Sequence, residues 1–173
     1  AGLIIKEAGT TKWSIFNDGD GSDKLLFEDD GDIRMVLQQD GNVGIGETSP
    51  DEMLHITSAT SWKPVFKLEN TNADAGGAKI QFYSTNTASP ADGDYMGLID
   101  FFGVDSNNNS TRYAYIAARA ADISADTEDG RIDFQTFVGG TETITMVLNA
   151  GKLGIGTESP DEPLHIETPS SGG

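Results

Sequence analysis

The sequence predicts an all-β fold. Strand-like alternation recurs along the chain, polar turn clusters separate the alternating segments, and no helical periodicity of useful length is present. Apolar side chains occupy every second position at 33–37, 80–82, 132–134 and 144–148, and further strands are expected at 64–68, 98–104 and 112–118. Turns rich in Asn, Asp, Gly and Ser are expected at 17–23, 29–32, 70–77 and 105–110. Residues 114–125 are the one stretch whose pattern fits a helix as well as a strand.

The composition favours a thin core and association between chains. Only 36% of the 173 residues are hydrophobic, and the 21 glycines contribute no side chain to a core. The net charge of −17, from 28 acidic and 11 basic residues, repels phosphate backbones and anionic lipids, so nucleic acid and membranes are disfavoured as partners. The absence of cysteine excludes disulfides and thiolate metal sites.

An internal repeat organises the chain. Residues 41–56 read GNVGIGETSPDEMLHI and residues 151–166 read GKLGIGTESPDEPLHI, and eleven of the sixteen positions are identical. The likeness continues upstream, where 32–37 matches 143–148 with one extra residue in the first copy, which a bulge or a longer turn would absorb. The repeat predicts three parts: 1–56 as the end of one module, 57–166 as a complete module, and 167–173 as the start of a further module or a linker.

Glycines recur at fixed places in the two copies, at Gly41, Gly44, Gly46, Gly151, Gly154 and Gly156. Because side chains alternate along a strand, Gly44 and Gly46 share one face that carries no Cβ atoms. Such a face lets another backbone approach closely or lets the chain bend sharply. We therefore expect a close backbone approach at both copies.

A short helical turn is expected after these glycines. Ser49 as N-cap, Pro50 at the first helical position and Glu52 three residues after the serine have the spacing of a capping box. The second copy repeats it with Ser159, Pro160 and Glu162. Pro163 limits the helix to one turn, and short strands are expected to follow at 54–56 and 164–166.

The two motif copies resemble the boundary repeat of phage tail fibre and tail spike proteins, and they cover about a fifth of the chain. Glu47 and Glu158 replace the threonine that is more usual in such corners. The resemblance implies a repetitive, elongated, parallel homotrimer, with or without strands interwoven between chains, that extends or displays a host-binding tip. Many relatives end in an endosialidase-type intramolecular chaperone, of which these residues contain no part. Similar repeats occur in other large surface proteins of bacteria and giant viruses.

The resemblance implies a structural component of a viral tail fibre, extracellular on a virion, and we expect no enzyme activity and no cofactor. Its expected partners are copies of itself, neighbouring fibre or virion proteins, and a host glycan or receptor. One alternative is that residues 70–130 themselves bind a host glycan or receptor. A less favoured alternative is a tail-spike depolymerase, which would need two carboxyl groups across an aromatic-lined groove. The aromatic residues are instead scattered and are expected in sheets or subunit contacts: Trp13, Trp62, Tyr83, Tyr95, Tyr113 and Tyr115.

Three segments partly match small-ligand sites, and none of the three sites is favoured. The Gly-Ile-Gly run lacks the long helix of a phosphate-binding loop, and Glu47 would repel the phosphate. His55 and His165 are weak metal candidates, since three copies could meet on a trimer axis, but no second ligand has a useful spacing. Asp18, Asp20, Ser22 and Asp29 loosely resemble a calcium loop without its sixth-position glycine, so a solvated acidic turn is expected there.

Overall fold

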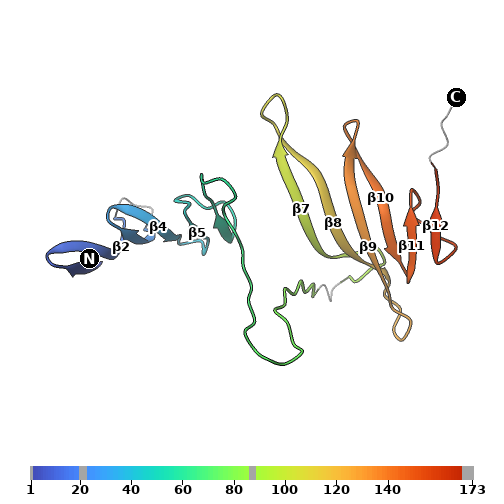
Figure 1. The fold of residues 1–173 in the computed structure, drawn as a ribbon, viewed down its shortest axis with the longest axis horizontal. Helices are drawn as coiled ribbons and strands as arrows, with labels where there is room; N and C mark the ends of the chain where they lie inside the picture. The colour runs from blue at the N-terminus through green and yellow to red at the C-terminus, as the bar shows by residue number, and fades with distance from the viewer. Residues whose placement is uncertain (1, 20–22, 86–88, 169–173) are drawn as a thin grey trace. The chain divides into compact units, whose positions relative to one another are not determined.

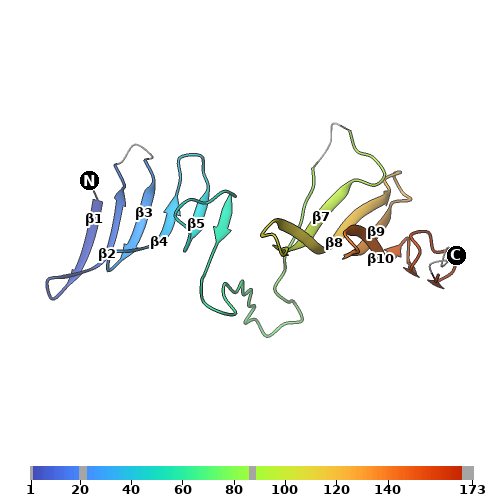
Figure 2. The same ribbon diagram turned by 90° about the horizontal axis from the view of Figure 1, so that it is seen from above.

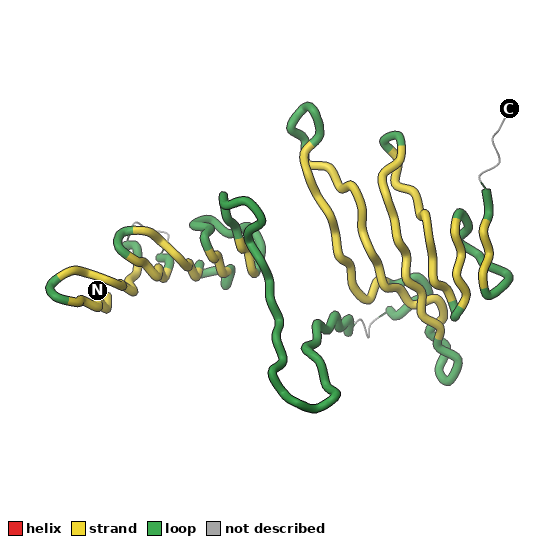
Figure 3. Tube along the Cα trace, in the orientation of Figure 1, coloured by secondary structure: helices red, strands yellow, loops and turns green. Residues whose placement is uncertain are grey.

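The computed structural model describes residues 2–19, 23–85 and 89–168, and within these ranges it contains strands, turns and loops but no helix (Figure 3). No described helix is therefore available to cross a membrane. The chain divides into two compact units, Ala1–Ala78 and Lys79–Gly173. Each unit contains one six-stranded sheet that forms a single layer (Figures 1 and 2). The predicted all-β class is confirmed.

The first sheet places its strands side by side in the order of the chain. The strands are β1 (Gly2–Glu7), β2 (Thr10–Asn17), β3 (Leu25–Asp29), β4 (Asp32–Leu37), β5 (Val43–Ile45) and β6 (Leu54–Ile56). The first five strands pair in antiparallel fashion, whereas β5 and β6 are parallel.

The second sheet repeats this topology. Its strands are β7 (Tyr95–Val104), β8 (Ser110–Asp122), β9 (Asp129–Val138), β10 (Thr141–Asn149), β11 (Lys152–Ile155) and β12 (Leu164–Ile166). All neighbours are antiparallel except the last pair, β11 and β12, which is parallel. The stretch 114–125, which the sequence left open, is strand as far as Asp122.

The extra residue of the first repeat copy lies in a longer turn. Five residues, 38–42, separate the paired Leu37 and Val43, whereas four, 149–152, separate the equivalent pair Leu148 and Leu153. Ala150 and Gly151 both have positive φ, 48° and 78°, as a two-residue hairpin turn of type I′ requires. The longer-turn explanation for the one-residue difference is therefore the correct one.

Two strand predictions and the helical turn were wrong. Residues 64–68 and 79–83 form no strand, because no strand in the described part of the chain lies beside them to complete a ladder. The Ser-Pro segments form bends and no helical turn. The short strands expected after them, Leu54–Ile56 and Leu164–Ile166, are confirmed.

Candidate functional site

The second sheet carries apolar side chains across its whole width on one face, which we call the open face. Residues that are directly paired on neighbouring strands point to the same face. One apolar row that follows from the pairing is Ile99, Ile116, Phe134, Met146, Ile155 and Ile166. The adjacent row is Gly97, Ala118, Ile132, Leu148, Leu153 and Leu164. No member of either row is buried.

The first sheet has the same open face, strand for strand. Its long row is Leu3, Ile15, Phe27, Met35, Ile45 and Ile56. The adjacent row contains Leu25, Leu37, Val43 and Leu54. These positions too are half-buried or exposed. The duplication therefore extends over all six strands and conserves an apolar surface that the described chain leaves uncovered.

One side chain of the same unit does rest on the second open face. The Phe82 ring lies over Gly97, where an added Cβ would come within 2.6 Å of Phe82 Cβ. Around it Ile99, Ile116 and Ala118 line an open, apolar hollow of about 110 Å³. Phe82 itself stays 55% exposed, so this contact covers only a small part of the surface.

The opposite face of each sheet, which we call the packed face, holds the core. Alternation along the strands places all the buried core residues on this face: Leu26, Val36, Tyr115, Ala117, Val147, Ser14, Asp133 and Gln135. Val36 and Val147 occupy equivalent positions and are both completely buried. A thin core thus forms on one side of each layer, while the other side remains apolar and accessible.

The repeated corner covers one end of the packed face. Eight residues, 46–53, link the parallel strands β5 and β6, although parallel neighbours usually need a connection of about a dozen residues or more. An added Cβ on Gly44 would collide with the Glu47 carbonyl oxygen. At Gly154 the same atom would lie 2.5 Å from the Thr157 carbonyl oxygen. The glycines therefore permit a close backbone approach, and the approaching backbone is that of the corner itself.

The second pair of corner glycines is constrained in conformation as well as in space. Gly46 and Gly156 have φ of 72° and 76°. A Cβ at Gly46 would lie 2.5 Å from the Thr57 carbonyl oxygen, and one at Gly156 would overlap the carbonyl oxygen of Glu167. Gly41 and Gly151 also have positive φ, but the space around them is open.

The serine-proline segments are held by an interaction that the capping-box hypothesis did not include. Glu47 Oε1 accepts a hydrogen bond from the Ser49 amide at 2.9 Å, and Thr157 Oγ1 accepts one from the Ser159 amide at 3.4 Å. Pro50 and Pro160 are buried, whereas Glu52 and Glu162 are exposed. Glu47 thus supplies a side-chain oxygen acceptor where the second copy has a threonine. Either residue type can hold the corner, provided that it offers this acceptor.

Both histidines lie on the packed face, each beside an aspartate of its own corner. His55 Nδ1 lies 2.8 Å from Asp51 Oδ1, and His165 Nδ1 lies 2.7 Å from Asp161 Oδ1. These contacts are ion pairs when the imidazole is protonated, but they lack the alignment of a regular hydrogen bond. In the described part of the chain, no group of three or more His, Asp or Glu side chains is placed to bind a metal ion.

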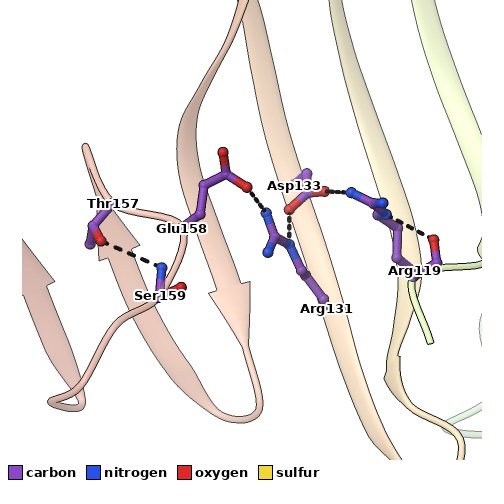
Figure 4. A network of polar contacts seen from close by, with 7 residues as sticks. Arg119, Arg131, Asp133, Thr157, Glu158 and Ser159 are labelled. Atoms are coloured by element: carbon purple, nitrogen blue, oxygen red, sulfur yellow. Dashed lines mark hydrogen bonds and ion pairs between the residues drawn. The ribbon is translucent and has the colours of Figure 1, made fainter.

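A buried carboxylate joins two arginines on the packed face of the second sheet (Figure 4). Asp133 is fully buried, and its two oxygens accept hydrogen bonds from Arg119 Nη1 at 3.3 Å and from Arg131 Nε. Arg131 Nη2 also donates to Glu158 at 2.8 Å. Burial alone would lower the pKa of Arg131, but hydrogen bonds to Asp133 and Glu158 outweigh it and raise that pKa. Glu158, the second departure from the motif, thus ties the corner to the sheet.

Tyr115 gives the packed face a measurable dependence on pH. Burial, followed by hydrogen bonding to Tyr95, raises the pKa of Tyr115 from 10.0 to about 12. The folded state therefore favours the neutral phenol, and this contribution to stability is complete below pH 10 and is lost as the pH rises from 10 towards 12. We expect the free energy of unfolding to fall by up to about 2 kcal/mol over that interval because of this group.

The measurement is denaturant unfolding at several pH values for the wild type and for Tyr115→Phe. The substitution should reduce the decline in the free energy of unfolding above pH 10. Tyrosinate absorbance should show one late-titrating phenol fewer. Parallel stability curves for the two proteins would contradict the assignment.

Among the residues that the structure describes, the remaining predicted candidates are not brought together. Within the range 70–130, residues 70–85 form a loop without strand, and residues 95–130 run through β7 and β8 to the start of β9. In the calcium-like cluster, Asp20 and Ser22 lie outside the described residues, and Asp29 pairs with Arg34 at 3.4 Å. Among the aromatic side chains, Tyr115 is buried while Trp62 and Tyr83 are 94% and 79% exposed.

Two features were missed at the sequence level. The apolar rows of the open faces are defined by the register between neighbouring strands, which the sequence alone does not give. The Arg119–Asp133–Arg131 group had one local signal, since alternation in 131–135 places a carboxylate next to arginine on one strand face. No protein-family model matches this sequence, and no curated protein matches it significantly.

Proposed function

We propose that this chain is a structural module of a trimeric viral fibre, most specifically a bacteriophage tail fibre, in which it forms part of the shaft or presents a receptor-binding tip. The observation that carries the proposal is the open face, which crosses all six strands of each sheet and has almost no cover in the described chain. A sheet buries its apolar face against a second layer, and a homotrimer supplies that layer from copies of itself.

The size of the uncovered surface supports an assembly. Soluble monomers rarely expose contiguous apolar patches of more than a few hundred Å². Here Ile99, Leu148 and Leu164 of one face are 47%, 43% and 56% exposed. Burying each such side chain is worth about 1.5–3 kcal/mol, and three chains would contribute equivalent rows to one core.

The number three rests on the resemblance of the corner motif to tail fibre repeats. Two open faces would form a sandwich, whereas three around an axis would form a prism in which each sheet is one side. Both six-stranded sheets have the same apolar rows, so both can form the sides of such a prism in the same way. A prism built in this way lengthens by repetition of the module, as a fibre requires.

The unpaired segment between the sheets also favours assembly. Trp62, in a turn, and Val65 and Phe66, in the loop that follows it, are 94%, 64% and 68% exposed and have no strand partners in the described chain. In a trimer, neighbouring chains would provide both cover and edges for it. Interwoven strands are part of the proposal at this segment.

The packed faces would then be directed outward, together with His55 and His165, so an axial metal bound by these histidines is not part of the proposal. The net charge of −17 suits an extracellular virion surface that does not adhere to itself. The proposal assigns no catalytic residue and no cofactor.

The mass of the assembled protein tests the proposal. Sedimentation equilibrium at micromolar concentration should give three times the 18.4 kDa of one chain. The trimer should persist on dilution, because its interface would be the core of the fold. A folded monomer, or a dimer at every concentration tested, would contradict it.

A further inference from the structure

The structure points to a second site on the packed face of the second sheet, and we propose that it binds a small sugar acid through its carboxylate. Gly93, Arg119, Arg131 and Asn149, together with Ala120 and Ala121, line an open hollow of about 180 Å³. This is about the space that a single sugar ring fills. The proposal does not depend on the trimer, because its three polar residues, Arg119, Arg131 and Asn149, lie on the packed face of one sheet, away from the apolar rows.

Strand pairing gathers cations at this place in an otherwise acidic chain. Arg119 pairs with Arg131, Arg131 pairs with Asn149, and Asn149 pairs with Lys152. Like charges directly opposite each other on neighbouring strands destabilise a sheet. The row carries three positive charges against the two carboxylates of Asp133 and Glu158, in a chain whose net charge is −17.

The first sheet shows that the fold does not need these cations. The positions equivalent to this row, counted from the matching apolar residues, are Asp18, Lys24, Gln38 and Asn42. They hold one acid and one base. The position equivalent to Asp133 is Leu26, an ordinary core residue. A buried ion group is no more stabilising than well-packed apolar side chains. The presence of Asp133 where the first sheet has Leu26 therefore calls for a role other than stability.

The arginines are held rigidly and still have donors to offer. Arg119 is fixed by Nε donating to the Gly93 carbonyl oxygen at 3.1 Å, by Asp133, and by the Tyr95 ring 4.6 Å from its guanidinium carbon. Arg131 is fixed by Asp133 and Glu158. Within the described residues, Arg119 Nη2 and Arg131 Nη1 make no hydrogen bond.

Those two nitrogens suit a carboxylate. Each guanidinium has five N–H donors, and half-buried donors without a partner are costly. Arginine forks match the planar, two-oxygen geometry of a carboxylate group. Asn149 adds an amide to the rim that can bond a ring hydroxyl. The flanking Asp92 and Asp94 do not line the hollow, and their carboxylates accept amide hydrogens from Ile123 and Ala91.

The test titrates glucuronate, glucose and acetate into the full chain and follows heat or arginine side-chain NMR signals. Glucuronate should bind with a dissociation constant on the order of millimolar, and glucose and acetate at least tenfold more weakly. Equal binding of acetate would overturn the sugar-ring part of the proposal, and equal binding of glucose would overturn the carboxylate part.

Asn149→Asp places a carboxylate in the row while both arginines remain, and it should weaken glucuronate binding at least about tenfold by charge repulsion. Gln38→Glu is the matched control, since it makes the same charge change at the equivalent half-buried position of the first sheet. The control should bind as the wild type does. Equal weakening by both variants would reduce the effect to net charge and overturn the site.

A gain-of-function variant guards against a folding defect in Asn149→Asp. Asn149→Lys adds a cation to the rim and should tighten glucuronate binding, with an unfolding midpoint close to that of the wild type. Unchanged or weaker binding by a folded Asn149→Lys protein would overturn the proposal.

Discussion

Replacing Leu3 by Asp should dissociate the assembly, whereas the same change at the neighbouring Ile4 should leave it intact. The two side chains are equally exposed in the chain, at 58% each, so a monomer would tolerate both changes alike. Leu3 pairs with Ile15 and lies on the open face, whereas Ile4 pairs with Ser14 and lies on the packed face. Burying an aspartate in an apolar core without a partner costs several kcal/mol, and a trimer incurs that cost three times.

The equivalent change in the second sheet, Ile99→Asp, should act in the same direction because Ile99 occupies the place of Leu3 in its row. Sedimentation velocity gives the oligomeric state, and denaturant unfolding gives the stability. We expect loss of the trimer for Leu3→Asp and Ile99→Asp, and wild-type sedimentation for Ile4→Asp. Equal behaviour of Leu3→Asp and Ile4→Asp would show that the open face is not the assembly surface.

Local patterns predicted those parts of the fold that depend on local sequence alone. Alternation located the strands around Met35 and Met146, and the motif located the three-residue strands that contain His55 and His165. These elements also have partners within the chain, so the tendency of the local sequence and the tertiary structure agree.

The extent of the duplication could not be predicted because its spacing is not constant. Equivalent residues are 96 positions apart at Leu3 and Ile99, 107 at Phe27 and Phe134, and 110 at Ile45 and Ile155. Loops and strands of different length change the offset step by step. A search at one fixed offset detects only the last strands, where the corner fixes the spacing.

The strand predictions for the unpaired segments were wrong for a different reason. The residues around Val65 and Ile80 have a strand-like pattern, but a strand exists only beside another strand, and the sequence does not say which chain supplies it. The Ser-Pro-x-Glu pattern predicted a helical turn that does not form, because a single helical turn has little stability by itself. The side-chain oxygen of Glu47 takes the Ser49 amide instead and holds the bend.

The corner glycines give the second large effect, and their role lies within one chain. Gly154→Ala should destabilise the protein by about 1–3 kcal/mol or more, because the new Cβ would lie 2.5 Å from the Thr157 carbonyl oxygen and 3.0 Å from Val147 Cγ2. Gly154→Val should be worse, since a branched side chain cannot turn away from both. Gly44→Ala and Gly44→Val should repeat this order in the first sheet.

Gly130→Ala is the matched control, since Gly130 lies in β9 of the same sheet with open space around it and no positive φ. It should be neutral or stabilising by about 0.5 kcal/mol, because alanine restricts the unfolded chain. Val43→Ala, which trims a half-buried side chain on the open face, should cost less than either change at Gly44. Denaturant midpoints of the variants give the ranking. If Gly154→Ala and Gly130→Ala had the same denaturant midpoint, the corner would have room for a side chain. Its glycines would then serve the close approach of another chain and not the folding of the corner itself.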